Sequence, residues 1–109
     1  MTFKYDVAIV GGCGHIGLPL GLLIARSGRR VLLVDTDQAR VAAVKEGRMP
    51  FTEEGAQAIL DQELDRRVFA ACETPAAVEA EGIIVTVGTP VDEYLNPKYA
   101  PVQIGRAHV

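Results

Sequence analysis

The chain has 109 residues, 49% of them hydrophobic, and a formal net charge of -3. Its length allows one domain and is short for the two-domain layout of most cofactor-dependent enzymes, which points to a fragment of a longer protein. Lys and Arg are interspersed with Asp and Glu, so the chain offers no face of a single charge to nucleic acid or to anionic lipid. We therefore expect a domain whose partner is a small molecule.

The N-terminus and the cysteine content favour a cytoplasmic protein. Lys4 and Asp6 stand where a signal peptide has its apolar core, and no apolar run approaches the roughly 20 residues that span a bilayer. Cys13 and Cys72 are too few for a disulfide framework and lack the spacing of metal ligands. We predict two reduced thiols and no metal site.

Short apolar runs alternate with segments long enough for helices. Continuous runs at 5–10 and 30–35 predict strands buried on both faces, as in a parallel sheet, and further strands are predicted at 68–72 and 83–87. Strands that alternate with helices imply right-handed crossovers. The predicted fold is α/β, an incomplete Rossmann-like doubly wound parallel sheet with about four strands.

The first predicted helix lies within residues 14–28 and stops at Gly28. Pro19 falls about five residues into this segment, where it should bend the first turn. The large apolar residues expected to pack on the sheet are Leu20, Leu23 and Ile24.

Three more helices complete the expected pattern. Asp37 is the predicted N-cap of the second helix, and Thr74 is that of a fourth helix before the last strand. The third helix is expected over about 53–65. Glu53 and Glu54 then read either as first-turn carboxylates that complement the helix dipole or as an acid/base pair, and the first reading explains them at least as well.

A glycine-rich segment joins the first strand to the first helix. Gly12, Gly14 and Gly17 form the pattern G-x-G-x-x-G. The first glycine would allow a tight turn, the second would let a pyrophosphate approach the backbone, and the third would let helix and strand pack closely. The N-terminus of the helix would offer unpaired N–H groups and its positive dipole to the phosphates.

Asp35 ends the second predicted strand, 18 residues after Gly17. At that point a carboxylate accepts hydrogen bonds from both ribose hydroxyls of the adenosine half of a dinucleotide, and it would repel a 2′-phosphate. The sequence therefore favours NAD over NADP. Arg40 qualifies this choice, because a nearby cation would neutralise a phosphate.

Two residues of the glycine segment have alternative readings. Cys13 could be a nucleophile, but a small side chain that fills a tight turn is favoured, because no general base is in view. His15 could polarise a ligand through its side chain, although its backbone N–H is the favoured contact with the cofactor. No catalytic residue is assigned.

Four stretches carry a family resemblance. GGCGHIGLPLG, VLLVDTDQARV, GRMPFTEEGAQAIL and VTVGTPVDEYLNP resemble, in order and spacing, the N-terminal NAD-binding domain of the UDP-glucose/GDP-mannose dehydrogenase family. These enzymes oxidise the C6 alcohol of a nucleotide sugar to a carboxylate in two NAD-dependent steps. Glu54 stands where the family has the proline of Glu-Pro-Gly, so this turn lacks the proline found in the family.

The resemblance implies a role for each matching residue. His15 and Ile16 would meet the pyrophosphate with the three glycines, Asp35 the adenosine ribose, Arg40 the adenosine edge, and Thr89 the cofactor beyond the fourth strand. The implied cofactor-binding residues are Gly12, Gly14, His15, Ile16, Gly17, Asp35, Arg40 and Thr89. The family's catalytic cysteine, lysines and sugar-binding residues lie in later segments, so we expect this chain alone to be inactive and the complete protein to be a homodimer acting on a nucleotide sugar.

The last six residues of the chain form a separate sequence feature. IGRAHV, residues 104–109, is what the reading frame ATC GGA AGA GCA CAC GTC would encode, and that nucleotide sequence resembles a common sequencing adapter. We expect 1–102 to be a partial NAD-binding Rossmann domain and 103–109 a non-native tail.

The sequence leaves two alternative functions open. These are a dinucleotide-sensing regulatory module and an NAD-dependent dehydrogenase of the 3-hydroxyacyl-CoA or 6-phosphogluconate type.

Overall fold

Five strands form one sheet in the described part of the chain, residues 3–86 and 102–103 of a computed structural model. They are β1 (Tyr5–Val10), β2 (Val31–Val34), β3 (Val68–Ala71), β4 (Ala80–Thr86) and β5 (Val102–Gln103). The strand order is β3-β2-β1-β4-β5, and every neighbouring pair is parallel except β4 and β5. The predicted Rossmann-like sheet of four parallel strands is confirmed, and the short antiparallel β5 is an addition to it.

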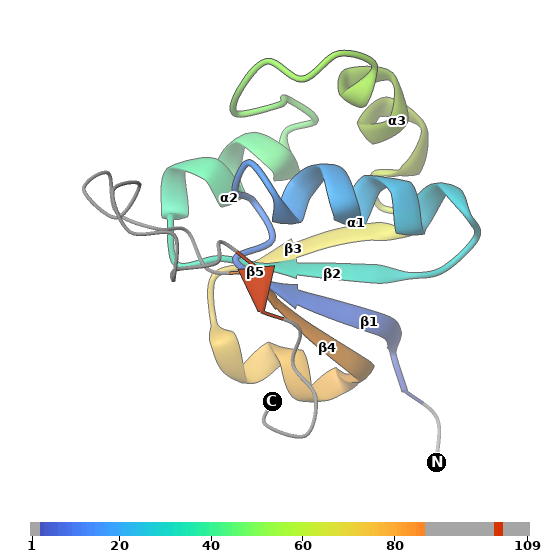
Figure 1. The fold of residues 1–109 in the computed structure, drawn as a ribbon, viewed down its shortest axis with the longest axis vertical. Coiled ribbons are helices and arrows are strands. Elements are labelled where there is room, and N and C mark those ends of the chain that lie inside the picture. The colour runs from blue at the N-terminus through green and yellow to red at the C-terminus, as the bar shows by residue number, and fades with distance from the viewer. Residues whose placement is uncertain (1–2, 87–101, 104–109) are drawn as a thin grey trace.

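Helices cover both faces of this sheet. They are α1 (Gly17–Arg26), α2 (Gln38–Lys45), α3 (Ala56–Glu63) and the 3₁₀ helix η1 (Thr74–Glu79). In Figure 1, α1, α2 and α3 lie on one side of the strands and η1 lies on the other. The chain therefore winds from β1 through β2 to β3 on one face and returns to β4 beside β1 across the opposite face, which makes the sheet doubly wound.

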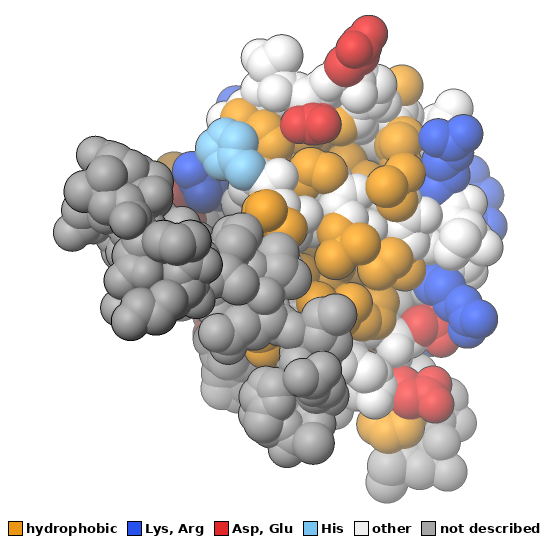
Figure 2. Space-filling view, in the orientation of Figure 1, with side chains coloured by type: hydrophobic (Ala, Val, Ile, Leu, Met, Phe, Trp, Pro, Cys, Tyr) orange, Lys and Arg blue, Asp and Glu red, His pale blue; other side chains and the backbone are white. Residues whose placement is uncertain are grey.

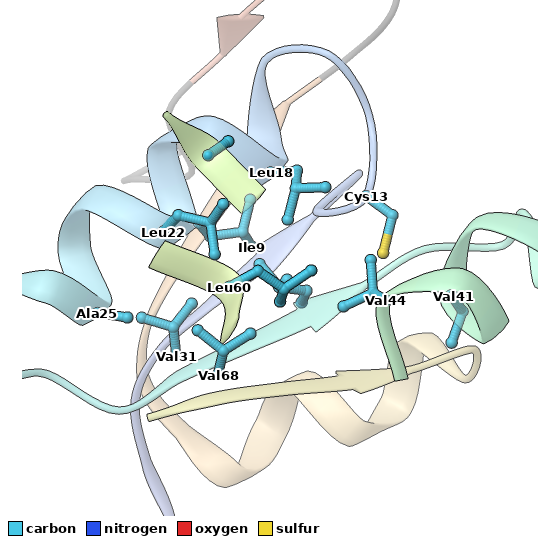
Figure 3. Packing of buried hydrophobic residues seen from close by; sticks show 12 residues of the cluster. Ile9, Cys13, Leu18, Leu22, Ala25, Val31, Val41, Val44, Leu60 and Val68 are labelled. Atoms are coloured by element: carbon cyan, nitrogen blue, oxygen red, sulfur yellow. The ribbon is translucent and has the colours of Figure 1, made fainter. Parts of the chain in front are cut away.

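Each face of the sheet has its own hydrophobic core. The larger core lies beneath α1, α2 and α3 and includes Ile9, Leu33 and Leu60, all fully buried. Figure 3 shows side chains from these helices meeting those of the strands in one cluster. The smaller core lies on the η1 side and includes Ala8 and Leu32. All four residues of β2 are buried, because alternate residues fill the two cores.

The face that α1 turns to the sheet differs from the predicted one. Leu23 is 57% exposed, whereas its neighbour Leu22 is 1% exposed. The buried residues of α1 are Gly17, Leu18, Gly21, Leu22 and Ala25. A β-carbon at Gly21 would lie 2.6 Å from Leu33 Cδ2, so this glycine lets α1 approach the sheet closely. The expectation that Leu20, Leu23 and Ile24 face the sheet is wrong for Leu23, because the small residues set the contact face.

The first turn of α1 accommodates Pro19 without a break. Because the helix begins at Gly17, Pro19 is its third residue and not a residue deep within it. N–H groups of a first turn have no partner inside the helix, so the missing N–H of proline costs little there. At the other end Gly28 adopts a φ of +107°, which confirms the predicted stop.

The helix α3 is shorter than predicted at both ends. Its N-cap is Gly55, whose φ of +81° turns the chain sharply before the first helical residue, Ala56. Glu53 and Glu54 therefore precede α3 and are not part of its first turn, which corrects that expectation. The helix ends at Glu63.

The N-terminal ends of α2, η1 and β4 lie close to the predicted positions. Asp37 is the N-cap of α2, as predicted, and its carboxylate accepts the Arg40 N–H at 3.1 Å. The N-cap of η1 is Glu73 in place of Thr74, and β4 begins at Ala80, three residues earlier than expected. Residue 87, Thr89 and residues 104–109 lie outside the described residues. Gln103, the first residue of the predicted non-native tail, is part of β5, and the tail as a whole stays a prediction.

Candidate functional site

The site lies at the carboxyl end of β1. Its neighbours β2 and β4 are reached by crossovers on opposite faces of the sheet, so the order of the strands switches at this point. Open α/β sheets bind ligands in the crevice outside the carboxyl ends of their strands at such a switch point. The glycine segment, residues 11–16, follows β1 directly and leads into α1.

Hydrogen bonds hold the glycine segment to both neighbouring strands. The Val34 carbonyl at the end of β2 accepts the N–H groups of Gly11 at 2.7 Å and Gly12 at 3.0 Å. From β4, the Thr86 hydroxyl lies 3.1 Å from the carbonyl oxygens of both Val10 and Gly11, to which it donates. Sequence reasoning missed Thr86, whose only local signal is a hydroxyl at the end of an apolar strand.

The glycines meet different spatial demands. Gly11 makes the turn with a φ of +83°, whereas a β-carbon at Gly12 would lie 2.6 Å from the Ile9 carbonyl oxygen. A β-carbon at Gly17 would collide with the Gly11 carbonyl oxygen. At Gly14 the nearest atom of the described residues would be 3.5 Å away, so the packing of this part of the chain leaves room for a side chain. That open space is what a phosphate approaching the backbone requires.

The Asp35 carboxylate is fixed beside the glycine segment by two backbone donors. Its Oδ2 accepts the Cys13 N–H at 3.0 Å, and its Oδ1 accepts the Asp37 N–H at 2.9 Å. Each oxygen retains a further lone pair, because a carboxylate accepts about four hydrogen bonds. The half-buried carboxylate is thus oriented to accept hydrogen bonds from a diol such as the ribose of adenosine.

The entry to α1 leaves donors for an anion. Its N-cap, Ile16, makes no side-chain capping bond within residues 3–86 and 102–103. The N–H groups of His15, Ile16 and Gly17 donate to no backbone carbonyl of that same described portion. Such N–H groups, together with the positive end of the helix dipole, suit a phosphate.

Arg40 borders the site from α2. Its Nη1 would lie 3.8 Å from a β-carbon at Gly14, and its Nε lies 3.5 Å from Asp37 Oδ2. The guanidinium therefore lies beside the space above Gly14 while its charge is partly balanced by Asp37. The expected contact of Arg40 with the adenosine edge stays a prediction.

Cys13 contributes its backbone to the site and its side chain to the core. Its side chain is fully buried beside Leu18 and Val44 (Figure 3). Burial raises the pKa of the Cys13 thiol to about 12, and the negative charge of Asp35 adds to that increase. A neutral, enclosed thiol is no nucleophile, so the structure favours the packing role over the catalytic one.

A comparison with protein families shows to which family this chain belongs. The family model described as "UDP-glucose/GDP-mannose dehydrogenase family, NAD binding domain" matches residues 5–103. The chain belongs to this family. The match confirms the resemblance drawn from the four motifs and identifies NAD as the cofactor of this dehydrogenase-family domain. The fixed carboxylate of Asp35, the space at Gly14 and the N–H groups after it, which donate to no backbone carbonyl of the described residues, fit that cofactor.

Curated relatives of this dehydrogenase-family domain are longer proteins. UDP-glucose 6-dehydrogenase of Pseudomonas aeruginosa is 37% identical over 84 residues, which are 75% of this chain and 18% of the relative. UDP-glucose 6-dehydrogenase TuaD of Bacillus subtilis is 32% identical over 89 residues, 80% of this chain and 19% of the relative. UDP-N-acetyl-D-mannosamine dehydrogenase of Methanococcus aeolicus is 32% identical over 82% of this chain and 20% of the relative.

Solved structures show the same fold. A UDP-glucose dehydrogenase from Pyrobaculum islandicum superposes with a TM-score of 0.72 at 26% identity, over 79% of this chain and 20% of the other. A GDP-mannose dehydrogenase from Pseudomonas aeruginosa gives a TM-score of 0.72 at 24% identity, over 78% and 20% of the two chains. The dehydrogenase-family domain therefore spans about a fifth of these proteins.

The structure gathers most of the predicted site residues at one end of the sheet. Those brought together are Gly12, Gly14, His15, Ile16, Gly17, Asp35 and Arg40. Thr89 lies outside the described residues.

Glu53 lines an open pocket of about 480 Å³, which is formed by the segment between α2 and α3 together with Gln57. No helix in the described ranges is long and apolar enough to cross a membrane.

Proposed function

We propose that this chain is the NAD-binding part of a nucleotide-sugar 6-dehydrogenase, which oxidises the C6 alcohol of a UDP- or GDP-sugar to a carboxylate. The substrates named for the relatives support this class, and the family match supports the cofactor. The observation that carries the proposal is the Asp35 carboxylate, held by two backbone N–H groups beside the glycine segment.

Each part of the site would have one task in binding. Asp35 would accept hydrogen bonds from the ribose hydroxyls of the adenosine half, and its charge would repel a 2′-phosphate. The N–H groups of His15 and Ile16 would hold the pyrophosphate over Gly14. Bound NAD would supply the hydride acceptor for the oxidation. The chain itself would bind and orient this cofactor, since we assign no catalytic residue to it.

The properties of the complete protein are part of the same proposal. We place the catalytic residues in segments beyond this chain and expect the chain alone to have no dehydrogenase activity. The complete protein would be cytoplasmic, and the family resemblance implies that it would be a homodimer. Residues 103–109 would be a non-native tail, and a genomic sequence that continues through Val109 in the same frame would contradict this.

Calorimetric titration of the chain with NAD and with NADP tests the cofactor site. We expect NAD to bind more tightly than NADP. Asp35→Ala should weaken NAD binding roughly 10- to 100-fold, because one charged hydrogen-bond acceptor is worth about 1.5–3 kcal/mol. The same substitution should narrow the difference between NAD and NADP, since the repulsive carboxylate is gone.

Two further variants control for loss of folding. Asp35→Asn keeps the shape of the side chain and one acceptor oxygen, and we expect intermediate NAD affinity. Glu79→Ala removes an exposed carboxylate from η1 on the opposite face and should bind NAD like the unchanged chain. Equal NAD affinity of all four proteins, with circular dichroism showing them folded, would refute the assignment of Asp35.

A further inference from the structure

The segment RMPFTEEG, residues 48–55, has no role in the site described above. We call it the 48–55 loop; it follows α2 and leads into α3. The binding of a dinucleotide by a glycine segment and an acidic residue does not by itself require such a loop. Its contacts with the rest of the chain indicate what it does.

An aromatic stack joins the 48–55 loop to the glycine segment. The ring of Phe51 lies 4.1 Å from that of His15, centroid to centroid, with an angle of 21° between the planes. His15 is exposed, and Figure 2 shows the pale-blue histidine side chain at the surface against hydrophobic neighbours. Phe51 is half-buried and packs against the larger core. One ring is therefore anchored in the core, and the other belongs to the segment that would hold the pyrophosphate.

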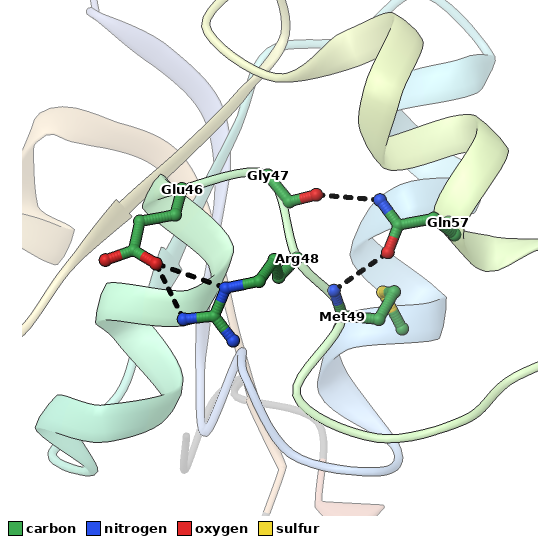
Figure 4. Close-up of polar contacts among 5 residues, drawn as sticks. All are labelled: Glu46, Gly47, Arg48, Met49 and Gln57. Atoms are coloured by element: carbon green, nitrogen blue, oxygen red, sulfur yellow. Dashed lines mark hydrogen bonds and ion pairs between the residues drawn. The ribbon is translucent and has the colours of Figure 1, made fainter.

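Gln57 of α3 fixes the start of the 48–55 loop. Its Nε2 donates to the Gly47 carbonyl at 2.7 Å, and its Oε1 accepts the Met49 N–H at 3.0 Å (Figure 4). The same Nε2 lies 2.8 Å from Asp61 Oδ1, which orients the amide. Beside these contacts, Arg48 pairs with Glu46 at 2.6 Å. The loop that carries Phe51 is thus bonded to an adjacent helix and is not held by the stack alone.

From this geometry we propose that Phe51 is a positioning residue for NAD, acting through His15. The stack holds His15, and with it the N–H groups of His15 and Ile16, in the conformation that receives the pyrophosphate. A segment already held in its bound conformation loses less entropy when the ligand arrives, so the stack increases affinity without touching the cofactor. The inference rests on the proposed placement of the pyrophosphate at His15 and Ile16.

A double-mutant cycle on NAD affinity tests the proposal. Phe51→Leu keeps an apolar side chain but removes the stack, and His15→Ala removes the other ring while leaving its backbone N–H. An aromatic pair of this kind corresponds to roughly a threefold to tenfold change in a binding constant. We expect each single variant to bind NAD more weakly by about that factor. The double variant should bind no more weakly than the single variants, because both changes break one contact.

Matched variants separate positioning from general destabilisation. Phe51→Tyr keeps the aromatic ring and should bind NAD as tightly as the unchanged chain. Phe69→Leu makes the same substitution in the Phe69–Tyr5 pair, whose ring centroids lie 5.4 Å apart in the smaller core, and should leave NAD affinity unchanged while lowering thermal stability. If Phe51→Leu does not fold, His15→Ala, a change at an exposed side chain, carries the test.

The outcomes distinguish this inference from the proposed function. If the unchanged chain binds NAD and either Phe51→Leu or His15→Ala binds it equally tightly, the inference is overturned and the proposed function stands. Additive losses in the double variant also overturn it, because Phe51 would then act without His15. Failure of the unchanged, folded chain to bind NAD would overturn both.

Discussion

The two thiols of this domain differ in their surroundings, and the difference follows from where each cysteine meets the sheet. Cys13 belongs to the glycine segment and its side chain is fully buried, whereas Cys72 follows β3 and is only partly buried. With a pKa raised to about 12, Cys13 carries almost no thiolate near neutral pH. Its chemistry is therefore suppressed at the place where its backbone N–H serves Asp35.

Alkylation should distinguish the two thiols. At pH 8 we expect iodoacetamide to modify Cys72 at least about tenfold faster than Cys13, since only the accessible thiolate reacts. Peptide mass spectrometry measures both rates, and Cys72→Ser should abolish the fast phase. In urea the two thiols should react alike. Fast labelling of Cys13 in the folded chain would contradict its burial.

The raised pKa also predicts a pH dependence of stability. An unfolded thiol ionises near pH 9.0, whereas the folded Cys13 thiol ionises near pH 12. Between these values the folded chain binds more protons than the unfolded chain, so the free energy of unfolding falls as pH rises through this window. Urea unfolding measures this decrease in the free energy of unfolding, and the part due to the thiol should be absent in Cys13→Ser.

Individual site residues were predictable where the signal is local. Gly14 and Asp35 stand at fixed positions relative to a strand end, so a pattern within one βαβ unit identifies them. Thr86 and Phe51 escaped prediction because their partners are distant in the sequence. The Thr86 hydroxyl contacts Gly11 across 75 positions, and the Phe51 ring meets His15 only after α1, β2 and α2 have folded between them.

At the scale of elements, α1 shows how small residues decide a packing face. Gly17 and Gly21 are spaced by one helical turn and both face the sheet or the glycine segment at contact distance. Large residues on either side of this stripe, such as Leu18 and Leu22, fill the core. Hydrophobicity alone favoured Leu23, because periodicity shows that a helix has an apolar face but a helix rich in leucine has several candidates.

Adjacent leucines of α1 test this orientation. Leu22→Ala should lower the free energy of unfolding by about 2–5 kcal/mol, because it leaves a cavity in the larger core. Leu23→Ala removes the same atoms from a side chain that is 57% exposed and should cost less than about 1 kcal/mol. Urea denaturation measures both. Similar losses from the two variants would show that α1 packs on the sheet through a different face.

At the scale of the whole molecule, the strand order determines where the site forms. β1 is flanked by β2 and β4, and the crossovers on opposite faces open a crevice at its carboxyl end. The glycine segment fills this position while bonded to Val34 on one side and Thr86 on the other. The cofactor site is therefore a product of three strands that are far apart in the sequence.

Hydrogen exchange should reveal the same arrangement. β1 and β2 are each paired on both sides, whereas β3 is paired on one side in the described part of the chain. We expect amides of β1 and β2, such as Ala8 and Leu32, to exchange at least about tenfold more slowly than those of β3 and η1. NMR exchange rates in the native state measure this. Uniform rates across all strands would contradict it.

The sequence by itself determined the local features of this protein. Continuous apolar runs specify strands buried on both faces, and the motifs specify the family, the cofactor class and the acidic residue at the end of β2, because each signal lies within one short segment. Tertiary structure alone decided the contact face of α1, the Thr86 bond to the glycine segment and the stack of Phe51 on His15. These contacts depend on which distant segments the fold brings together, and a local pattern carries no information about that.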